Sequence, residues 1–160
     1  MDNEPILSGG CACGAIRYTL SQEPMIVHAC HCLDCQKISG SAFALNMWIE
    51  SAAVRLEGEE SHSYRLDGGS GQPHDVHFCG RCGTNLWSKY HASPDATIFV
   101  KAGTLDRPEL IRPDVHIFTR SKRDWLHLDD ETPQYEAFYP IKEVWSAQSL
   151  GRLRKTLDKG

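Results

Sequence analysis

The spacing of its seven cysteines constrains this 160-residue chain more than any other feature. They form two close pairs and one triplet: Cys11 with Cys13, Cys79 with Cys82, and Cys30 with Cys32 and Cys35. Zinc in structural sites takes four ligands, and its bonds to cysteine sulfur are about 2.3 Å long. The two pairs supply four sulfurs and the triplet supplies three. The pattern therefore predicts two zinc ions, one enclosed by protein and one with a free coordination position.

The two pairs are the stronger of the two signals. Cys79-Gly80-Arg81-Cys82-Gly83 is typical of a zinc knuckle, in which glycines let backbone N–H groups turn toward the sulfurs. Buried free cysteines are the alternative interpretation, but two tight pairs in glycine-rich turns favour metal. We expect a structural zinc here, because four protein sulfurs leave no room for a substrate.

The triplet leaves two interpretations open. His31, Asp34 or one of the other histidines could complete a second structural site, although an extended backbone would point His31 away from the cysteines on either side. Alternatively the site stays open and reactive. A zinc ion with three thiolates is soft and favours a further sulfur ligand, whose pKa it would lower. The second interpretation makes Cys30, Cys32 and Cys35 both metal ligands and catalytic residues.

Positive charge near the triplet would help to bind the carboxylate of a peptide-like thiol. The sequence offers five candidates: Lys37, Lys101, Arg120, Lys122 and Arg123. Any single one of them is more often an ordinary solvated surface residue.

Composition narrows the partners and the location. The formal net charge of −4 would become about −7 with seven thiolates and two zinc ions, which disfavours general nucleic-acid binding. No apolar run approaches the roughly 20 residues that cross a bilayer. Residues 1–5 are acidic and lack the features of a signal peptide, so we expect reduced cysteines and a cytoplasmic location. The sequence does not indicate an oligomeric state.

Residue patterns predict one mainly β domain over residues 1–160, with a core at about 6–128. The expected strands lie in residues 16–20, 25–29, 42–49, 53–57, 59–66, 77–87, 97–103 and 115–118. Residues 36–40 suit one helical turn that ends at Gly40, and residues 67–73 suit a loop. Residues 129–160 form a C-terminal extension, irregular to Pro140 and helical in composition over 141–157, where Gly151 weakens the helix.

The combined motifs resemble the glutathione-dependent formaldehyde-activating enzyme family, which also includes centromere protein V-type domains. The resemblance spans about residues 8–126. It is carried by residues 10–14, 30–37, 78–83, 102–106 and 116–118, with the order CxC, CxCxxC, CxxC.

The resemblance implies a β-tent fold, in which antiparallel sheets are pinned by the four-cysteine zinc site. It also implies a second zinc at Cys30, Cys32 and Cys35 that the family associates with glutathione and S-hydroxymethylglutathione. The implied activity is that of a carbon–sulfur lyase run in reverse, in which a glutathione thiolate adds to formaldehyde.

Two other functions remain open. The same zinc could capture glutathione or a thiol adduct without accelerating its formation, as a binding module. A β-tent scaffold that binds a protein partner would instead show an exposed apolar patch and no affinity for small thiols.

Overall fold

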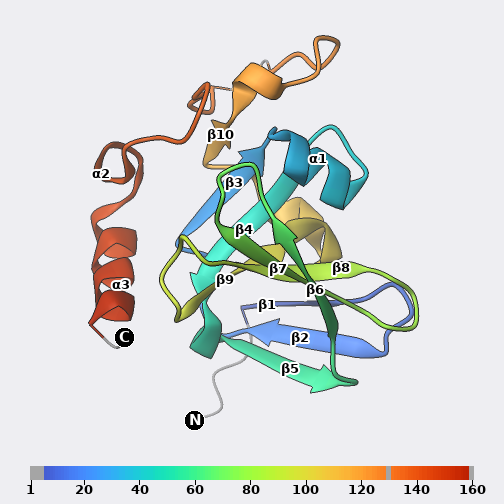
Figure 1. The fold of residues 1–160 in the computed structure, drawn as a ribbon. Helices are drawn as coiled ribbons and strands as arrows, with labels where there is room; N and C mark the ends of the chain where they lie inside the picture. Colours follow the sequence, from blue (N-terminus) through green and yellow to red (C-terminus); the bar gives the residue numbers. More distant parts are fainter. Residues whose placement is uncertain (1–5, 129–130, 159–160) are drawn as a thin grey trace.

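The computed structural model describes residues 6–128 and 131–158, which fold mainly as β structure (Figure 1). A three-stranded sheet has the order β1-β2-β5, with β1 at Leu7–Gly10, β2 at Ile16–Leu20 and β5 at Val54–Gly58. A seven-stranded sheet has the order β10-β3-β4-β9-β8-β7-β6. Its strands are β3 (Ile26–Cys30), β4 (Ala44–Glu50), β6 (His62–Asp67), β7 (Pro73–Phe78), β8 (Asn85–Tyr90), β9 (Thr97–Lys101) and β10 (Val115–Ile117). The predicted mainly β fold is confirmed, and its strands form two sheets in the described part of the chain.

The strand pairs are antiparallel with one exception, at the edge of the large sheet. β10 pairs with β3 in parallel, with Ile117 opposite Cys30. After β9 the chain passes through two 3-10 turns and then forms β10, which lies beside β3. The predicted antiparallel arrangement holds for the other strand pairs, and the parallel pair at this edge is an addition that the sequence did not indicate. The four 3-10 turns are η1 (Ser51–Ala53), η2 (Ala102–Thr104), η3 (Pro108–Leu110) and η4 (Thr119–Ser121).

The main core lies between the two sheets. Alternation in β2 places Ile16, Tyr18 and Leu20 in this core, as the period-two pattern predicts. From the large sheet, Met47 and Val100 pair across β4 and β9 and join the same cluster. The opposite face of the large sheet carries the second cluster and the polar groups described below.

The first helix, α1 (Leu33–Ser39), begins three residues before the predicted turn. Cys32 is its N-cap, and the Cys32 sulfur accepts the backbone N–H of Cys35. A thiol in this position does what serine or aspartate does in an ordinary cap. The predicted end is confirmed, since Gly40 adopts the left-handed conformation with φ of 64°.

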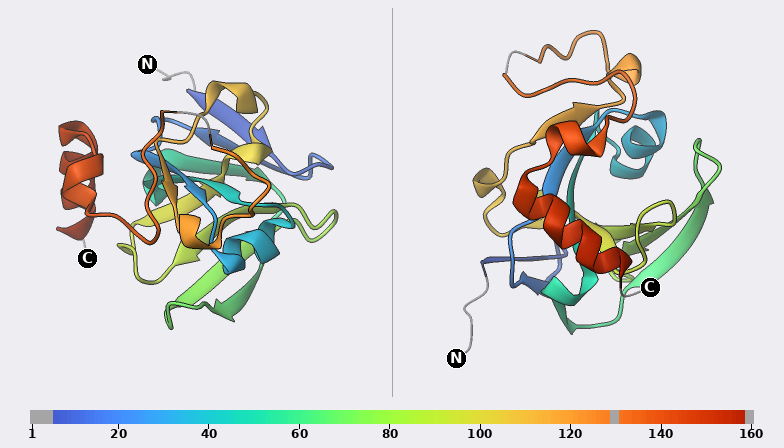
Figure 2. Two further views of the ribbon diagram at one scale, coloured as in Figure 1. Left: turned by 90° about the horizontal axis from the view of Figure 1, so that it is seen from above. Right: turned by 90° about the vertical axis from the view of Figure 1, so that its left-hand side faces the viewer.

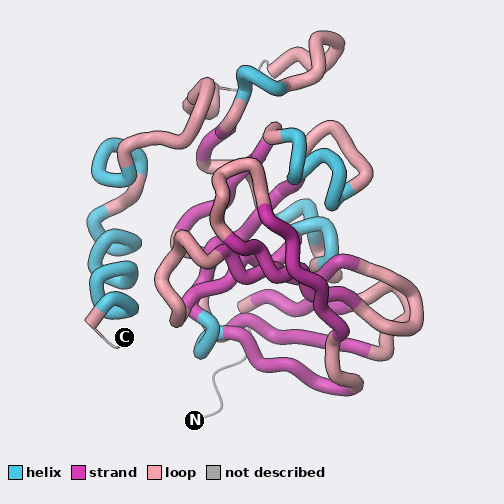
Figure 3. The backbone as a smooth tube through the Cα atoms, in the orientation of Figure 1, coloured by secondary structure: helices cyan, strands magenta, loops and turns pink. Residues whose placement is uncertain are grey.

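The C-terminal extension runs along one side of the molecule (Figure 2). Residues 131–140 are irregular, whereas residues 129–130 lie outside the described part of the chain. α2 (Ile141–Val144) and α3 (Ala147–Leu157) follow, and Ser146 caps α3 through the N–H of Ser149. Figure 3 shows α2 and α3 to the left of the strands. Within the described residues, no helix has the length and apolar character needed to span a bilayer.

Side-chain contacts attach the extension to the large sheet, in addition to backbone hydrogen bonds between residues 133–137 and residues 116–118. The Ser149 hydroxyl donates to the carbonyl of Met25 over 2.6 Å, and Arg152 forms a two-pronged ion pair with Glu50. The Tyr139 hydroxyl lies 2.6 Å from Nε2 of the buried His28 and accepts the indole N–H of Trp145 over 2.7 Å. The extension is thus a packed part of the domain.

Candidate metal centres

The two cysteine pairs meet at the end of the molecule where the β1–β2 and β7–β8 connections lie side by side (Figure 1). The four sulfurs all lie within 4.8 Å of one another, and the set is Cys11, Cys13, Cys79 and Cys82. The sulfurs of Cys11 and Cys13 lie 3.5 Å apart, and those of Cys13 and Cys79 lie 3.7 Å apart. Sulfurs bound at about 2.3 Å at the corners of a tetrahedron lie about 3.8 Å apart. This four-cysteine site therefore fits a zinc ion.

Local hydrogen bonds hold the four-cysteine site from both sheets. The backbone N–H of Ile16 donates to the Cys11 sulfur over 3.2 Å. Thr84 Oγ1 accepts the N–H of Ala12 over 3.1 Å and lies 3.1 Å from the Cys82 sulfur. Thr84 therefore links the turn after β1 to the turn after β7, beside the sulfurs.

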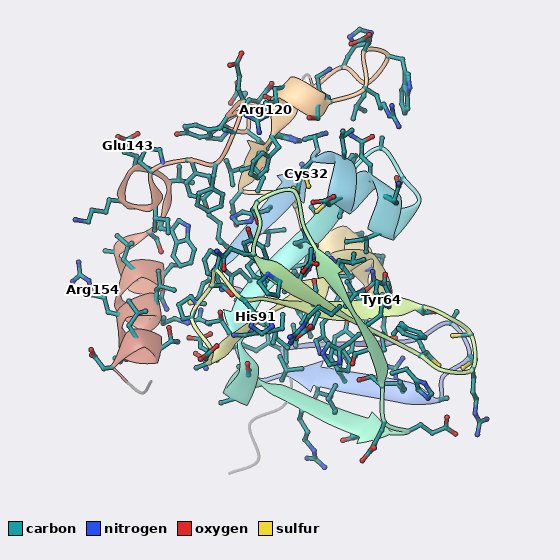
Figure 4. All side chains as sticks on the ribbon, in the orientation of Figure 1. Cys32, Tyr64, His91, Arg120, Glu143 and Arg154 are labelled. Atoms are coloured by element: carbon teal, nitrogen blue, oxygen red, sulfur yellow. The ribbon has the colours of Figure 1, made fainter. Side chains whose placement is uncertain are left out.

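The cysteine triplet forms a second cluster at the start of α1. Cys30 ends β3, Cys32 caps α1 and Cys35 lies in its first turn, and the three sulfurs lie within 4.8 Å of one another. Cys30 and Cys35 are buried, while Cys32 is partly exposed. Figure 4 shows the Cys32 side chain next to the start of α1. No fourth histidine, cysteine or carboxylate among residues 6–128 and 131–158 joins this group. This three-cysteine site fits a zinc ion with one position left for another ligand.

The two neighbours that could have closed the triplet make contacts elsewhere. The His31 side chain is fully buried, and its Nε2 lies 3.0 Å from Nδ1 of His116. The Asp34 carboxylate accepts the backbone N–H of Gly69 over 2.9 Å, from the turn between β6 and β7. These contacts favour the open interpretation of the site.

A buried polar pair lies beside the triplet on the second face of the large sheet. Lys101 Nζ donates to Asn46 Oδ1 over 2.7 Å, and Asn46 Nδ2 faces the Cys35 sulfur at 3.8 Å. Burial lowers the pKa of the Lys101 ammonium, and the three neighbouring sulfurs oppose that shift. The sequence made Lys101 a candidate to bind a carboxylate of the substrate. In the structure it is buried beside the cysteine triplet and contacts Asn46 instead.

His74 on β7 is a further residue near the cluster that the sequence analysis missed. Burial, helped by the charge of Lys101, lowers the pKa of His74 to about 4, so the imidazole is neutral at neutral pH. Asp34 and Cys32 act on the same imidazole in the opposite direction. The sequence analysis also missed Asn46, although it stands out as a lone amide inside the apolar run of residues 42–49. His74 had no comparable signal in the sequence.

The other candidate cations divide between a groove and local contacts. Lys37 and Arg123 line a groove of about 520 Å³ between α1 and the segment after η4, together with exposed Leu33 and Trp125. The other two make local contacts: Arg120 lies over the Phe118 ring, and Lys122 donates to the carbonyls of Arg123 and Leu126.

A family profile and a sequence relative point to the same family. The profile described as "Glutathione-dependent formaldehyde-activating enzyme" matches residues 6–121. A Halomonas elongata protein named "Putative glutathione-dependent formaldehyde-activating enzyme" is 30% identical over 152 residues, which cover 89% of this chain and 96% of the relative. A crystal structure of a Rhodobacter sphaeroides protein aligns with 67% of this chain and 97% of its own, with a TM-score of 0.49 and 19% identity.

Proposed function

The chain belongs to the glutathione-dependent formaldehyde-activating enzyme family, and from this premise we propose that it forms S-hydroxymethylglutathione from glutathione and formaldehyde. The observation that carries the proposal is the three-cysteine site, with three converging sulfurs and no fourth protein ligand among the described residues. We further propose that each chain holds two zinc ions and works in the reducing cytoplasm, where its cysteines stay reduced.

The proposed reaction is an addition. The sulfur of glutathione bonds to the formaldehyde carbon, the thiol proton leaves, and the carbonyl oxygen gains a proton to become the hydroxyl of the product. Zinc held by Cys30, Cys32 and Cys35 would supply a Lewis acid that stabilises a thiolate or polarises a carbonyl oxygen. The partial exposure of Cys32 leaves one side of the site accessible to solvent, and burial of Cys30 and Cys35 shields the other.

The groove next to α1 supports a peptide-like thiol as the substrate. Leu33 and Gln36 line this groove, and each directly follows one of the cysteines of the triplet. Lys37 and Arg123 offer two positive charges there, and glutathione carries two carboxylates. We propose that at least one carboxylate of glutathione binds at this groove.

Glutathione also adds to formaldehyde spontaneously, so formation of the adduct does not by itself show catalysis. Exchange NMR, which measures the rate of the reaction with and without protein, tests the proposed activity. The native protein should accelerate exchange between free glutathione and the adduct. A Cys32→Ser variant should lose the acceleration and one of two bound metal ions, while it keeps the other. Binding of glutathione without acceleration would support a binding module instead.

One observation favours a second candidate function, a scaffold for a protein partner. Leu33 and Trp125 are 65% and 69% exposed and line the same groove, so an apolar patch is present. Calorimetric titration with glutathione separates the two, since a scaffold should show no heat of binding with a small thiol.

A further inference from the structure

Lys101 is a buried cation that the proposed reaction has not used. It is 9% exposed, and its ammonium donates a hydrogen bond to the neutral amide of Asn46. In the described part of the chain, no carboxylate lies within ion-pair distance of its ammonium. Burial of a charge is unfavourable unless an opposite charge offsets it. A buried lysine without a carboxylate partner therefore indicates an anion of another kind nearby.

The anion is supplied by the cysteine triplet. The sulfurs of Cys35, Cys30 and Cys32 all lie within electrostatic range of the ammonium. Strand register sets this arrangement, because Lys101 on β9 pairs directly with Asn46 on β4. Three thiolates around a divalent cation carry a net charge of −1, which the ammonium can offset.

Asn46 fixes the direction of the link. Its Oδ1 accepts from Lys101 at 2.7 Å, which leaves its Nδ2 directed at the Cys35 sulfur, 3.8 Å away. An N–H directed at a thiolate withdraws charge from the sulfur. The ammonium thus acts on the site both through space and through one oriented amide.

The other ionisable groups near the site do not replace this charge. His74 is neutral at neutral pH, and Asp34 is anionic and accepts the N–H of Gly69. His28 is the cross-strand neighbour of Asn46 on β3, and its Nε2 forms a hydrogen bond with the Tyr139 hydroxyl. Lys101 is the positive charge that the described structure buries beside the triplet.

We propose that Lys101, oriented by Asn46, is a positioning residue that makes the three-cysteine site select an anionic sulfur ligand over a neutral one. The inference rests on the proposed function, in that the fourth position receives a thiol. With the ammonium present, an incoming thiolate meets a site of zero net charge; without it, the thiolate meets a charge of −1. The binding of a neutral ligand is insensitive to this difference.

The test uses full-length protein loaded with Co²⁺, whose absorption spectrum reports a new ligand. The probes are 2-mercaptoethanol, which binds as a thiolate, and imidazole, which binds as a neutral ligand. In Lys101→Met, thiol affinity should fall about tenfold or more, given the strength of charge interactions in a partly buried site, while imidazole affinity stays within about twofold. Lys101→Arg keeps the charge and should recover most of the thiol affinity.

Two further variants separate charge from folding. Lys89→Met is the matched control, because Lys89 is a largely buried lysine on the neighbouring strand β8 that donates to the carbonyls of Pro94 and Thr97. It should leave both affinities unchanged. Asn46→Asp retains the lysine but gives it a carboxylate partner, and should weaken thiol binding as Lys101→Met does.

Equal loss of affinity for both probes, or no loss for either, would overturn the proposal. If even the native protein binds no thiol, the proposed function fails, and the affinity for Co²⁺ measured against a competing chelator becomes the deciding result for Lys101. Lys101→Met should then bind Co²⁺ at this site at least tenfold more weakly than Lys89→Met. Equal Co²⁺ affinities would reject the role of Lys101.

Discussion

One residue of the cysteine triplet, Cys32, combines two roles. Cys32 is at once a candidate metal ligand and the N-cap of α1, so the same sulfur receives the Cys35 N–H. Both roles favour the thiolate, because a negative charge at a helix N-terminus is stabilised by the N–H groups that point at it. The start of α1 is therefore determined by the metal-binding motif.

The grouping of the cysteines was predictable because close spacing along the chain brings the sulfurs together. Asn46, Lys101 and His74 were different, since they come from three strands: register pairs Asn46 with Lys101, and His74 lies two strands farther along the sheet. Lys101 could be named as a cation near the site, but its burial and its amide partner depend on which residue of β4 lies opposite. A single sequence carries no local signal for that pairing.

Gly9 illustrates a close approach that a larger residue would break. A Cβ at this position would lie 2.4 Å from the Tyr18 hydroxyl and 2.5 Å from the Thr104 carbonyl oxygen. Tyr18 is buried and its hydroxyl lies 2.8 Å from Thr104 Oγ1, so it has little room to move. Gly9→Ala should lower the free energy of unfolding by about 2 kcal/mol, as overpacking typically does, measured by denaturant titration.

Gly151→Ala is the control for that substitution. No atom lies within 4 Å of a Cβ at position 151 in α3, so the added methyl should raise stability by about 0.5 to 1 kcal/mol. If both variants shift stability in the same direction, the packing argument for Gly9 is wrong.

Among the elements, α1 carries both the metal motif and one wall of the groove. Gln36 fastens this helix to the neighbouring segment, since its amide donates to the carbonyls of His31 and Ser121. Residues 119–126 thereby stay close to α1 and bring Arg123 to the side of the helix that presents Lys37. The position of this charge pair depends on the contact between the two segments.

The paired variant Lys37→Met with Arg123→Met tests the groove. Exposed charge pairs contribute at most about 1 kcal/mol each, so glutathione affinity should fall by about tenfold, as measured by calorimetry. Affinity for 2-mercaptoethanol, which has no carboxylate, should be unchanged. Arg55→Met with Lys155→Met removes two exposed cations from β5 and α3 and is the control. If both double variants lose affinity equally, for glutathione and for 2-mercaptoethanol alike, the groove does not contain a carboxylate site.

The hydrogen bond between His28 on β3 and Tyr139 in the C-terminal extension should depend on pH. Burial lowers the pKa of His28 to about 3 in the folded chain, whereas an unfolded histidine titrates near 6.5. Below pH 6.5 the unfolded chain therefore binds a proton that the folded chain does not, and stability falls as the pH drops toward 3. The residue whose protonation causes this loss of stability is the one that contacts Tyr139.

His28→Gln removes the titrating group but keeps a side-chain amide within reach of Tyr139. Relative to the native protein, its unfolding free energy should decline less on acidification, with a difference of about 2 kcal/mol accumulated by pH 5. Denaturant unfolding at pH 7 and pH 5 measures this. Loss of zinc at low pH affects both proteins alike, so parallel curves would contradict the role of His28.

On the scale of the whole molecule, the four-cysteine site joins the two sheets. Cys11 and Cys13 adjoin β1 and β2 of the small sheet, and Cys79 and Cys82 follow β7 of the large sheet. Sequence reasoning could predict that these segments meet. It could not predict that β10 lies parallel to β3 or where the extension packs, because those contacts join residues that are far apart in the sequence.

The two metal sites should therefore differ in their effect on stability. Cys82→Ser should lower the thermal unfolding midpoint by on the order of 10 °C, because it opens a structural zinc site. Cys32→Ser, at the site with three protein ligands, should change the midpoint by only about 1 to 3 °C. Calorimetric scans of both variants with zinc present measure the difference. A larger drop for Cys32→Ser would reverse the assignment of the two roles.

The link between the sheets also has a consequence for biosynthesis. The first cysteine pair leaves the ribosome well before the second, since Cys13 and Cys79 are 66 residues apart. During that interval two thiols of the nascent chain are exposed to oxidants with no metal to protect them. Zinc can complete the four-cysteine site only after Cys82 emerges, so the link between the two sheets cannot form before the second pair has been made.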